Sequence, residues 1–131
     1  MNISEYTAFF HDGSLIEIDH KNDKIELSMS SAEMDEEDLK EPIELSEDDC
    51  IIGKLHIEGV KSIIVNDELL EKPLKKEYDN GHIFDFEIND STVTLAIQWV
   101  NYPRKPETNY FSVTTIEGTK IYWENIPNLE D

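Results

Sequence analysis

The clearest alternation of apolar and polar residues runs over residues 82–100, HIFDFEINDSTVTLAIQWV. Aromatic and branched side chains occupy every second position, and Asn89-Asp90-Ser91 interrupts the pattern. Alternation of this kind on both sides of a short polar break is typical of a β-hairpin with one buried face. The predicted core face of the hairpin consists of Phe84, Phe86, Ile88, Val93, Leu95, Ile97 and Trp99. We therefore expect this hairpin to form the centre of the core.

Three shorter stretches near the N-terminus, 6–10, 15–19 and 25–30, show the same strand-like pattern. Asp12-Gly13 lies between the first two, and this dipeptide between apolar runs favours a tight hairpin turn. Because connections this short join only antiparallel neighbours, the three stretches are expected to form an antiparallel meander.

Residues 31–41 are harder to assign, because apolar residues are few and acidic residues are crowded. Ser30 and Glu33 fit a capping box that could begin a helix, but neighbouring acids repel one another along a helix. We expect the preceding strand to continue to about residue 34 and an acidic loop to follow, ended by Pro42. A short edge strand is expected at 43–45.

Further strands are expected at 50–57, 61–65, 110–116 and 121–123. Residues 66–70 are expected to leave the sheet, with a helical turn as one alternative, and the two prolines within 101–109 predict a loop. About nine strands with little helix predict a single, mainly antiparallel all-β domain over residues 1–131. A β-sandwich and a rolled sheet both fit this spacing.

Charge narrows the classes of partner. The chain has 30 acidic and 11 basic residues, for a net charge of -19. Such a chain repels nucleic acids and anionic membranes, so neither is an expected partner. A basic protein is the favoured partner, and binding to it should be fast and salt-sensitive. The acidity could instead serve solubility alone.

The sequence also gives an expectation of location. The N-terminal residues lack the basic region and apolar run of a signal peptide, and no apolar run approaches the length of a membrane span. A soluble, cytoplasmic protein is expected. The single cysteine, Cys50, follows two acids that would raise its thiol pKa, so it is expected to be a small buried side chain.

No motif predicts catalysis, a cofactor or a metal site. A Gly-rich phosphate loop, a G-x-S-x-G elbow and zinc-ligand spacing are all missing, and the acidic runs lack the spacing of a calcium loop. We expect a protein that is not an enzyme. The alternative of a ligand or metal pocket would use His11, Asp12, His20 and His56. Hairpin geometry argues against it, because His11 and His20 would lie roughly 20 Å apart.

Candidate contacts with a partner fall in two kinds of loop. Acidic runs could steer a basic protein, while tyrosine and arginine near the prolines are typical interface anchors, with Trp123 as a further candidate. The predicted partner-binding residues are Asp35, Glu36, Glu37, Asp38, Glu47, Asp48, Asp49, Tyr102, Arg104 and Tyr110.

Two short segments carry a resemblance to known proteins. FFHDGSLIEI at 9–18 resembles the N-terminal strand-turn-strand of small bacterial β-rich proteins, some of them immunity proteins of contact-dependent or polymorphic toxin systems. IYWENIPNL at 121–129 is similar to the endings of small bacterial β-rich domains. The resemblance implies a binding protein that neutralises a cognate toxin, and it implies no catalytic residues.

The leading hypothesis is therefore a non-catalytic acidic binding protein, such as an immunity-type inhibitor of a basic toxin. A small-ligand or metal-binding β-domain and a structural oligomerisation domain stay open as alternatives. The chain is expected to be a monomer or a small homo-oligomer.

Overall fold

The computed structural model describes residues 1–76, 78–100 and 110–129. In this part of the chain the strands are β1 (Ser14–Lys21), β2 (Lys24–Ser30), β3 (Ile52–Glu58), β4 (Ser62–Val65), β5 (Glu68–Leu69), β6 (Asn80–Asn89), β7 (Thr92–Val100), β8 (Tyr110–Glu117) and β9 (Lys120–Asn125). They form one antiparallel sheet in the order β5-β4-β8-β7-β6-β1-β2-β3-β9, which does not close into a barrel. The predicted all-β antiparallel class is confirmed, and the single sheet corresponds to the rolled-sheet alternative.

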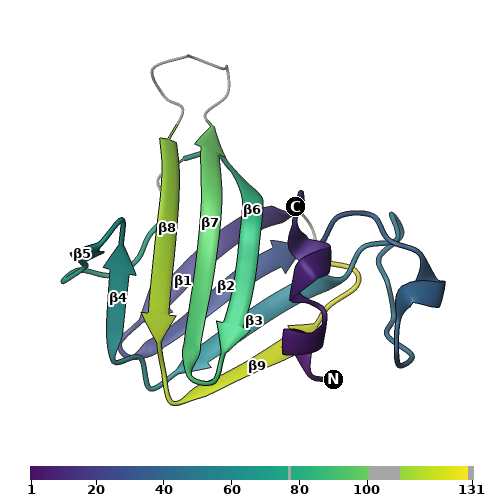
Figure 1. Ribbon diagram of the computed structural model, residues 1–131, viewed down its shortest axis with the longest axis horizontal. Coiled ribbons are helices and arrows are strands. Elements are labelled where there is room, and N and C mark those ends of the chain that lie inside the picture. Colours follow the sequence, from purple (N-terminus) through teal and green to yellow (C-terminus); the bar gives the residue numbers. More distant parts are fainter. Residues whose placement is uncertain (77, 101–109, 130–131) are drawn as a thin grey trace.

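The sheet folds back on itself between β6 and β1. These two strands pair only at Ser14–His82 and Leu15–Gly81, and beyond that point they diverge. Two layers result, and their strands cross in Figure 1. We name β5, β4, β8, β7 and β6 layer A, and β1, β2, β3 and β9 layer B. Each layer therefore has an inner face toward the core and an outer face.

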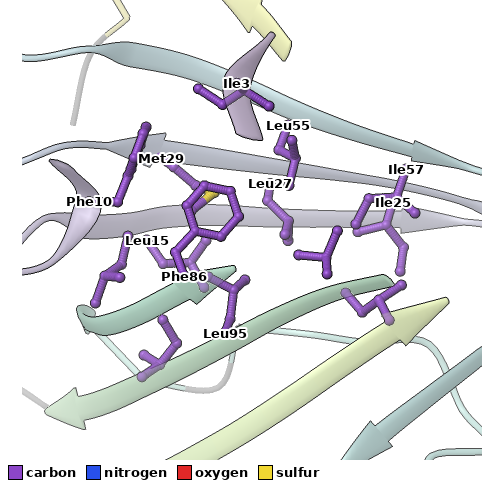
Figure 2. Packing of buried hydrophobic residues seen from close by; sticks show 14 of the residues in the cluster. Ile3, Phe10, Leu15, Ile25, Leu27, Met29, Leu55, Ile57, Phe86 and Leu95 are labelled. Atoms are coloured by element: carbon purple, nitrogen blue, oxygen red, sulfur yellow. The ribbon is translucent and has the colours of Figure 1, made fainter. Parts of the chain in front are cut away.

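The core fills the space between the inner faces. Figure 2 shows Phe86 and Leu95 of layer A facing Leu27, Met29 and Leu55 of layer B, and all five side chains are buried. Burial of each large apolar side chain contributes about 1.5–3 kcal/mol, so this contact holds the two layers together.

Residues 6–10 form no strand, contrary to the prediction. Two 3-10 helices occupy the N-terminus, η1 (Ile3–Glu5) and η2 (Thr7–Phe10). Residues 12–15 already occupy the edge of β6, where the Asp12 N–H donates to the Ile83 carbonyl, so no free edge is left for the preceding residues. The N-terminal segment instead folds across the open side of the molecule (Figure 1).

Phe10 anchors that segment between the two layers. Its ring packs edge-to-face on Phe86 of β6, with ring centroids 5.2 Å apart, and on Trp123 of β9, at 5.6 Å. Aromatic pairs in this geometry are favourable beyond their burial. The fully buried Phe10 thus links layer A to the outermost strand of layer B.

The region between β2 and β3 also differs from the prediction. Residues 31–34 lie beside 49–51 through isolated backbone hydrogen bonds rather than as an extension of β2, and the acidic loop contains η3 (Glu36–Asp38). The edge strand expected at 43–45 is not formed, although Ile43 and Leu45 pack against the core. Side-chain burial and one hydrogen bond, from the Asn125 side-chain amide of β9 to the Glu44 carbonyl at 2.9 Å, anchor this segment in place of strand pairing.

Two further corrections concern layer A. Residues 66–70 do not leave the sheet, because Asn66 and Asp67, both with positive φ, turn the chain back into β5. In β6 a bulge between Ile83 and Asp85 shifts the register, so Ile83 points inward and Phe84 outward, the reverse of the predicted faces. The loop predicted over 101–109 lies outside the described residues.

Candidate protein-binding surface

Large apolar side chains lie exposed on the outer face of layer A. Along β8, Ser112, Thr114 and Ile116 are buried, so strand alternation turns the residues between them outward. Register places neighbours from β4, β5 and β6 on the same face. We name this set the apolar face; it consists of Ile64, Leu69, Phe84, Phe111 and Val113.

An aromatic row forms one end of the apolar face. The Phe84 ring packs edge-to-face on Phe111 at 5.9 Å and on His11 at 5.4 Å. The Nδ1 atom of His11 also hydrogen-bonds the carbonyl oxygen of Phe84. Phe84 and Phe111 are 55% and 49% exposed, so both rings are positioned by neighbours yet remain accessible. Rigid, accessible aromatic side chains are the commonest anchors of protein interfaces.

Acidic side chains border the apolar face. Asp85 and Glu87 share the outer face of β6, and Glu117 lies at the end of β8. None of the three forms an ion pair with any residue in the described part of the chain. Unpaired carboxylates beside apolar surface attract lysine and arginine from a partner.

The outer face of layer B is a polar network instead. His56 is buried there, and its ring stacks on Tyr122 with centroids 4.6 Å apart. The Nε2 atom of His56 lies 2.8 Å from Oε1 of Glu124, and the Tyr122 hydroxyl donates to Oε2 of Glu58 at 2.7 Å. Lys24 lies 3.6 Å from the same Glu58 oxygen. Charged groups on this face are thus largely matched by groups of the same chain.

The Tyr122–Glu58 hydrogen bond alters both titrations. Donation from the Tyr122 hydroxyl stabilises the carboxylate and lowers the pKa of Glu58, with smaller help from Lys24. The same bond raises the pKa of Tyr122, because ionisation would remove the donor.

His56 has one unmatched atom. Its Nδ1 lies 3.5 Å from Oε1 of Glu26, too far for a good hydrogen bond, and it has no other hydrogen-bond partner in the described chain. Lys54 lies 3.9 Å from Glu26 on the other side.

The two predicted acidic runs are brought together by the fold. The Met34 N–H donates to the Asp49 carbonyl at 2.9 Å, which joins the segment before 35–38 to the turn 47–49. The runs Asp35, Glu36, Glu37, Asp38 and Glu47, Asp48, Asp49 are all exposed. They lie beyond the N-terminal helices, on the opposite side of the molecule from β8 (Figure 1).

The predicted aromatic anchors lie elsewhere. Tyr110 stacks on Tyr78 at 5.7 Å and accepts a hydrogen bond from the Asn66 side chain at 2.7 Å. Tyr102 and Arg104 lie outside the described residues. Trp123 packs on Phe10 and is half-buried. The structure therefore does not bring Tyr110 to the acidic runs as one continuous surface, whereas Trp123 reaches residue 44 before the second run through the Asn125 side chain.

The apolar face was not predicted from the sequence, although the pattern of β8 contained a signal for it. In YFSVTTIE of β8, both alternating sets contain large apolar residues, so one set had to face outward or meet another protein. The outward orientation of Phe84 could not be predicted from the alternation, because it depends on the bulge in β6.

The four residues of the alternative metal or ligand site occupy three separate places. Asp12 lies between His82, 3.1 Å from Nε2, and His11, 3.7 Å from Nε2. His20 lies at the opposite end of β1 and His56 on the outer face of layer B. Within the described ranges, no three His, Cys, Asp or Glu side chains are grouped so that they could hold a metal ion.

Cys50 is half-buried at the end of the acidic turn. Burial is the main cause that raises the pKa of its thiol, and Asp48 and Glu33 add to it. A raised pKa reduces the thiolate fraction, so this side chain is a weak nucleophile.

Comparisons with known proteins add no relative: no family model matches the chain, and neither a curated protein nor a solved structure is significantly similar to it. In the described chain, the helices are too short and polar to cross a bilayer. The resemblance of 9–18 to bacterial β-rich proteins that include immunity proteins stays a prediction, as does the resemblance of 121–129 to the endings of bacterial β-rich domains.

Proposed function

We propose that this protein is a non-catalytic acidic binding protein whose partner is a basic protein, with an immunity-type inhibitor of a basic toxin as the favoured form. The apolar face beside unpaired carboxylates is the observation that supports this proposal. Protein interfaces combine an aromatic centre with a polar rim, and this surface offers both.

Phe84 and Phe111 form the centre of the proposed interface. Both rings lie in contact before binding, so little side-chain freedom is lost when a partner covers them. Asp85, Glu87 and Glu117 then supply the acidic part of the rim. This arrangement favours a partner that presents an apolar patch bordered by lysine or arginine.

The acidic runs 35–38 and 47–49 have a different role in this proposal. They lie on the far side of the N-terminal helices, so they contribute to the long-range field rather than to the centre of contact. With a net charge of -19 the whole molecule attracts a cationic protein, and salt weakens that attraction. Tyr102, Arg104 and Tyr110 remain predicted contacts.

The test is a comparison of affinity baits in extracts of the native host at low salt. Wild-type protein, Phe84→Ser/Phe111→Ser and Glu36→Gln/Glu37→Gln serve as baits. We expect a basic protein that the wild type and the acidic-loop variant retain and the phenylalanine variant loses. A gene for that protein beside this one, and inhibition of its toxicity on co-expression, would establish the immunity form.

Purified components then give the decisive measurement. Biolayer interferometry of the captured protein should show weaker binding to the phenylalanine variant and only slower association with the acidic-loop variant. Equal binding of all three proteins would refute the assignment of the interface to the apolar face. A captured partner that is acidic would refute the proposed partner class.

A further inference from the structure

A cavity of about 170 Å³ lies between the inner faces of the two layers. Its walls come from β1, β2, β4, β7 and β8, together with Leu70, residues 72–75 and Tyr78, which lie between β5 and β6 in the chain. The apolar wall includes Ile18, Leu27, Leu95 and Ile97. A cavity of about 150 Å³ with such walls is enough to bind benzene.

One side of the cavity is aromatic. Tyr78 stacks between Trp99, at 5.9 Å, and Tyr110, at 5.7 Å. The Trp99 indole N–H donates to the Ser112 hydroxyl at 2.9 Å, so its ring orientation is fixed. The cavity thus presents a rigid aromatic surface before any ligand enters.

The charge around the opening is the reverse of the charge of the whole molecule. Lys72 and Lys75 are exposed and line the cavity. The described lining residues include no acid, although the chain has 30 acidic residues. Neither lysine forms an ion pair with a described residue. Two free ammonium groups at an apolar opening favour a ligand with an anionic head.

The segment that carries the lysines is held in place. The Leu74 N–H donates to Nδ1 of His20 at 2.9 Å, and the Lys76 ammonium donates to the Ile16 carbonyl at 2.8 Å. Both partners belong to β1, in the part that has diverged from β6. Residues 70–76 therefore form a fixed cover across the gap between the layers.

We propose that this cavity binds a small amphiphilic carboxylate, with an apolar body of about six to eight carbon atoms inside and the carboxylate at Lys72 and Lys75. The site lies on the inner face of layer A, whereas the apolar face lies outside. This inference is thus independent of the proposed partner protein.

The test uses ¹⁵N-labelled protein and three probes of matched shape: phenylacetate, 2-phenylethanol and phenethylamine. NMR spectra follow the two indole N–H signals. Trp99 lines the cavity and should shift saturably with phenylacetate, whereas Trp123 lies outside it and should not. The amine should bind at least roughly tenfold more weakly, because two ammonium groups repel it.

A charge-matched pair of variants isolates the lysines. Lys72→Gln/Lys75→Gln should weaken phenylacetate binding about tenfold and leave binding of the alcohol unchanged. Lys21→Gln/Lys40→Gln changes the net charge equally and should have no effect. Lack of a saturable Trp99 shift, amine binding as tight as carboxylate binding, or equal weakening by both variants would overturn the proposal. The phenylalanine variant of the apolar face should bind the probes normally.

Discussion

The outer faces of layers A and B belong to one sheet, but the residues at their outward positions differ in polarity. On layer B, most outward residues are polar, and His56, Tyr122 and Glu58 contact neighbours on the same face. On layer A, outward residues include Phe84 and Phe111, which are exposed and whose phenyl rings have no hydrogen-bonding groups. These polar groups of layer B are therefore bonded within the same chain, whereas layer A exposes apolar area that a second molecule could cover.

The difference begins in the local sequence. In β3, Lys54, His56 and Glu58 alternate with Leu55 and Ile57, so strand alternation places the three polar side chains on one face. In β8, Phe111 and Val113 lie between inward residues that are mostly small and polar. Exposed aromatic residues give the folded chain little stability, so their presence supports a role in binding.

The largest expected effect comes from separating the two layers at Phe10. Phe10→Ala should reduce the free energy of unfolding by about 3–5 kcal/mol, because it leaves a cavity between Phe86 and Trp123. Urea denaturation measures the change, with Phe9→Ala as a less buried control. A loss similar to that of the control would mean that η2 does not join the layers.

Next comes removal of the aromatic row from layer A. Phe84→Ser/Phe111→Ser should weaken partner binding by about a hundredfold, yet change the free energy of unfolding by less than about 1 kcal/mol. Interferometry and urea denaturation give the two numbers. A large loss of stability with little loss of binding would mean that these rings stabilise the fold rather than bind a partner. The proposed difference between the two outer faces would then be wrong.

A smaller effect is expected from the network on layer B. His56→Ala should cost about 1–2 kcal/mol of stability, because it removes the stack on Tyr122 and leaves Glu26 and Glu124 without the ring between them. His56→Phe keeps the stack and should cost less. Partner binding should be unchanged in both variants. A loss of binding would indicate that the interface includes layer B and would contradict its assignment to layer A.

The smallest effect is a titration shift in the same network. The depressed pKa of Glu58 means that its contribution to stability is present above the ordinary glutamate pKa and is lost as pH falls through the folded-state value. Tyr122→Phe removes the donor, so the pKa of Glu58 should rise toward its ordinary value. Carboxyl NMR titration of both proteins tests this, and identical titration curves would contradict the assigned cause.

Much of the scaffold follows from local pattern. The hairpin of β6 and β7 is confirmed, with Asp90 in positive φ at its turn, and so are most other strands and the all-β class. Strand alternation is a property of neighbours in sequence, so it can be read without knowing the fold. The acidic runs were likewise visible as exposed loops, because charged residues are rarely buried.

The rest was decided by contacts between residues distant in sequence. Residues 6–10 become helical turns because residues 12–15 hold the edge of β6, and Phe84 turns outward because β6 bulges against β7. A one-residue shift of register exchanges the two faces of a strand, and the local sequence does not reveal where it occurs. Sequence alone therefore determined which segments are strands, whereas the tertiary structure decided which side chains remain available for binding.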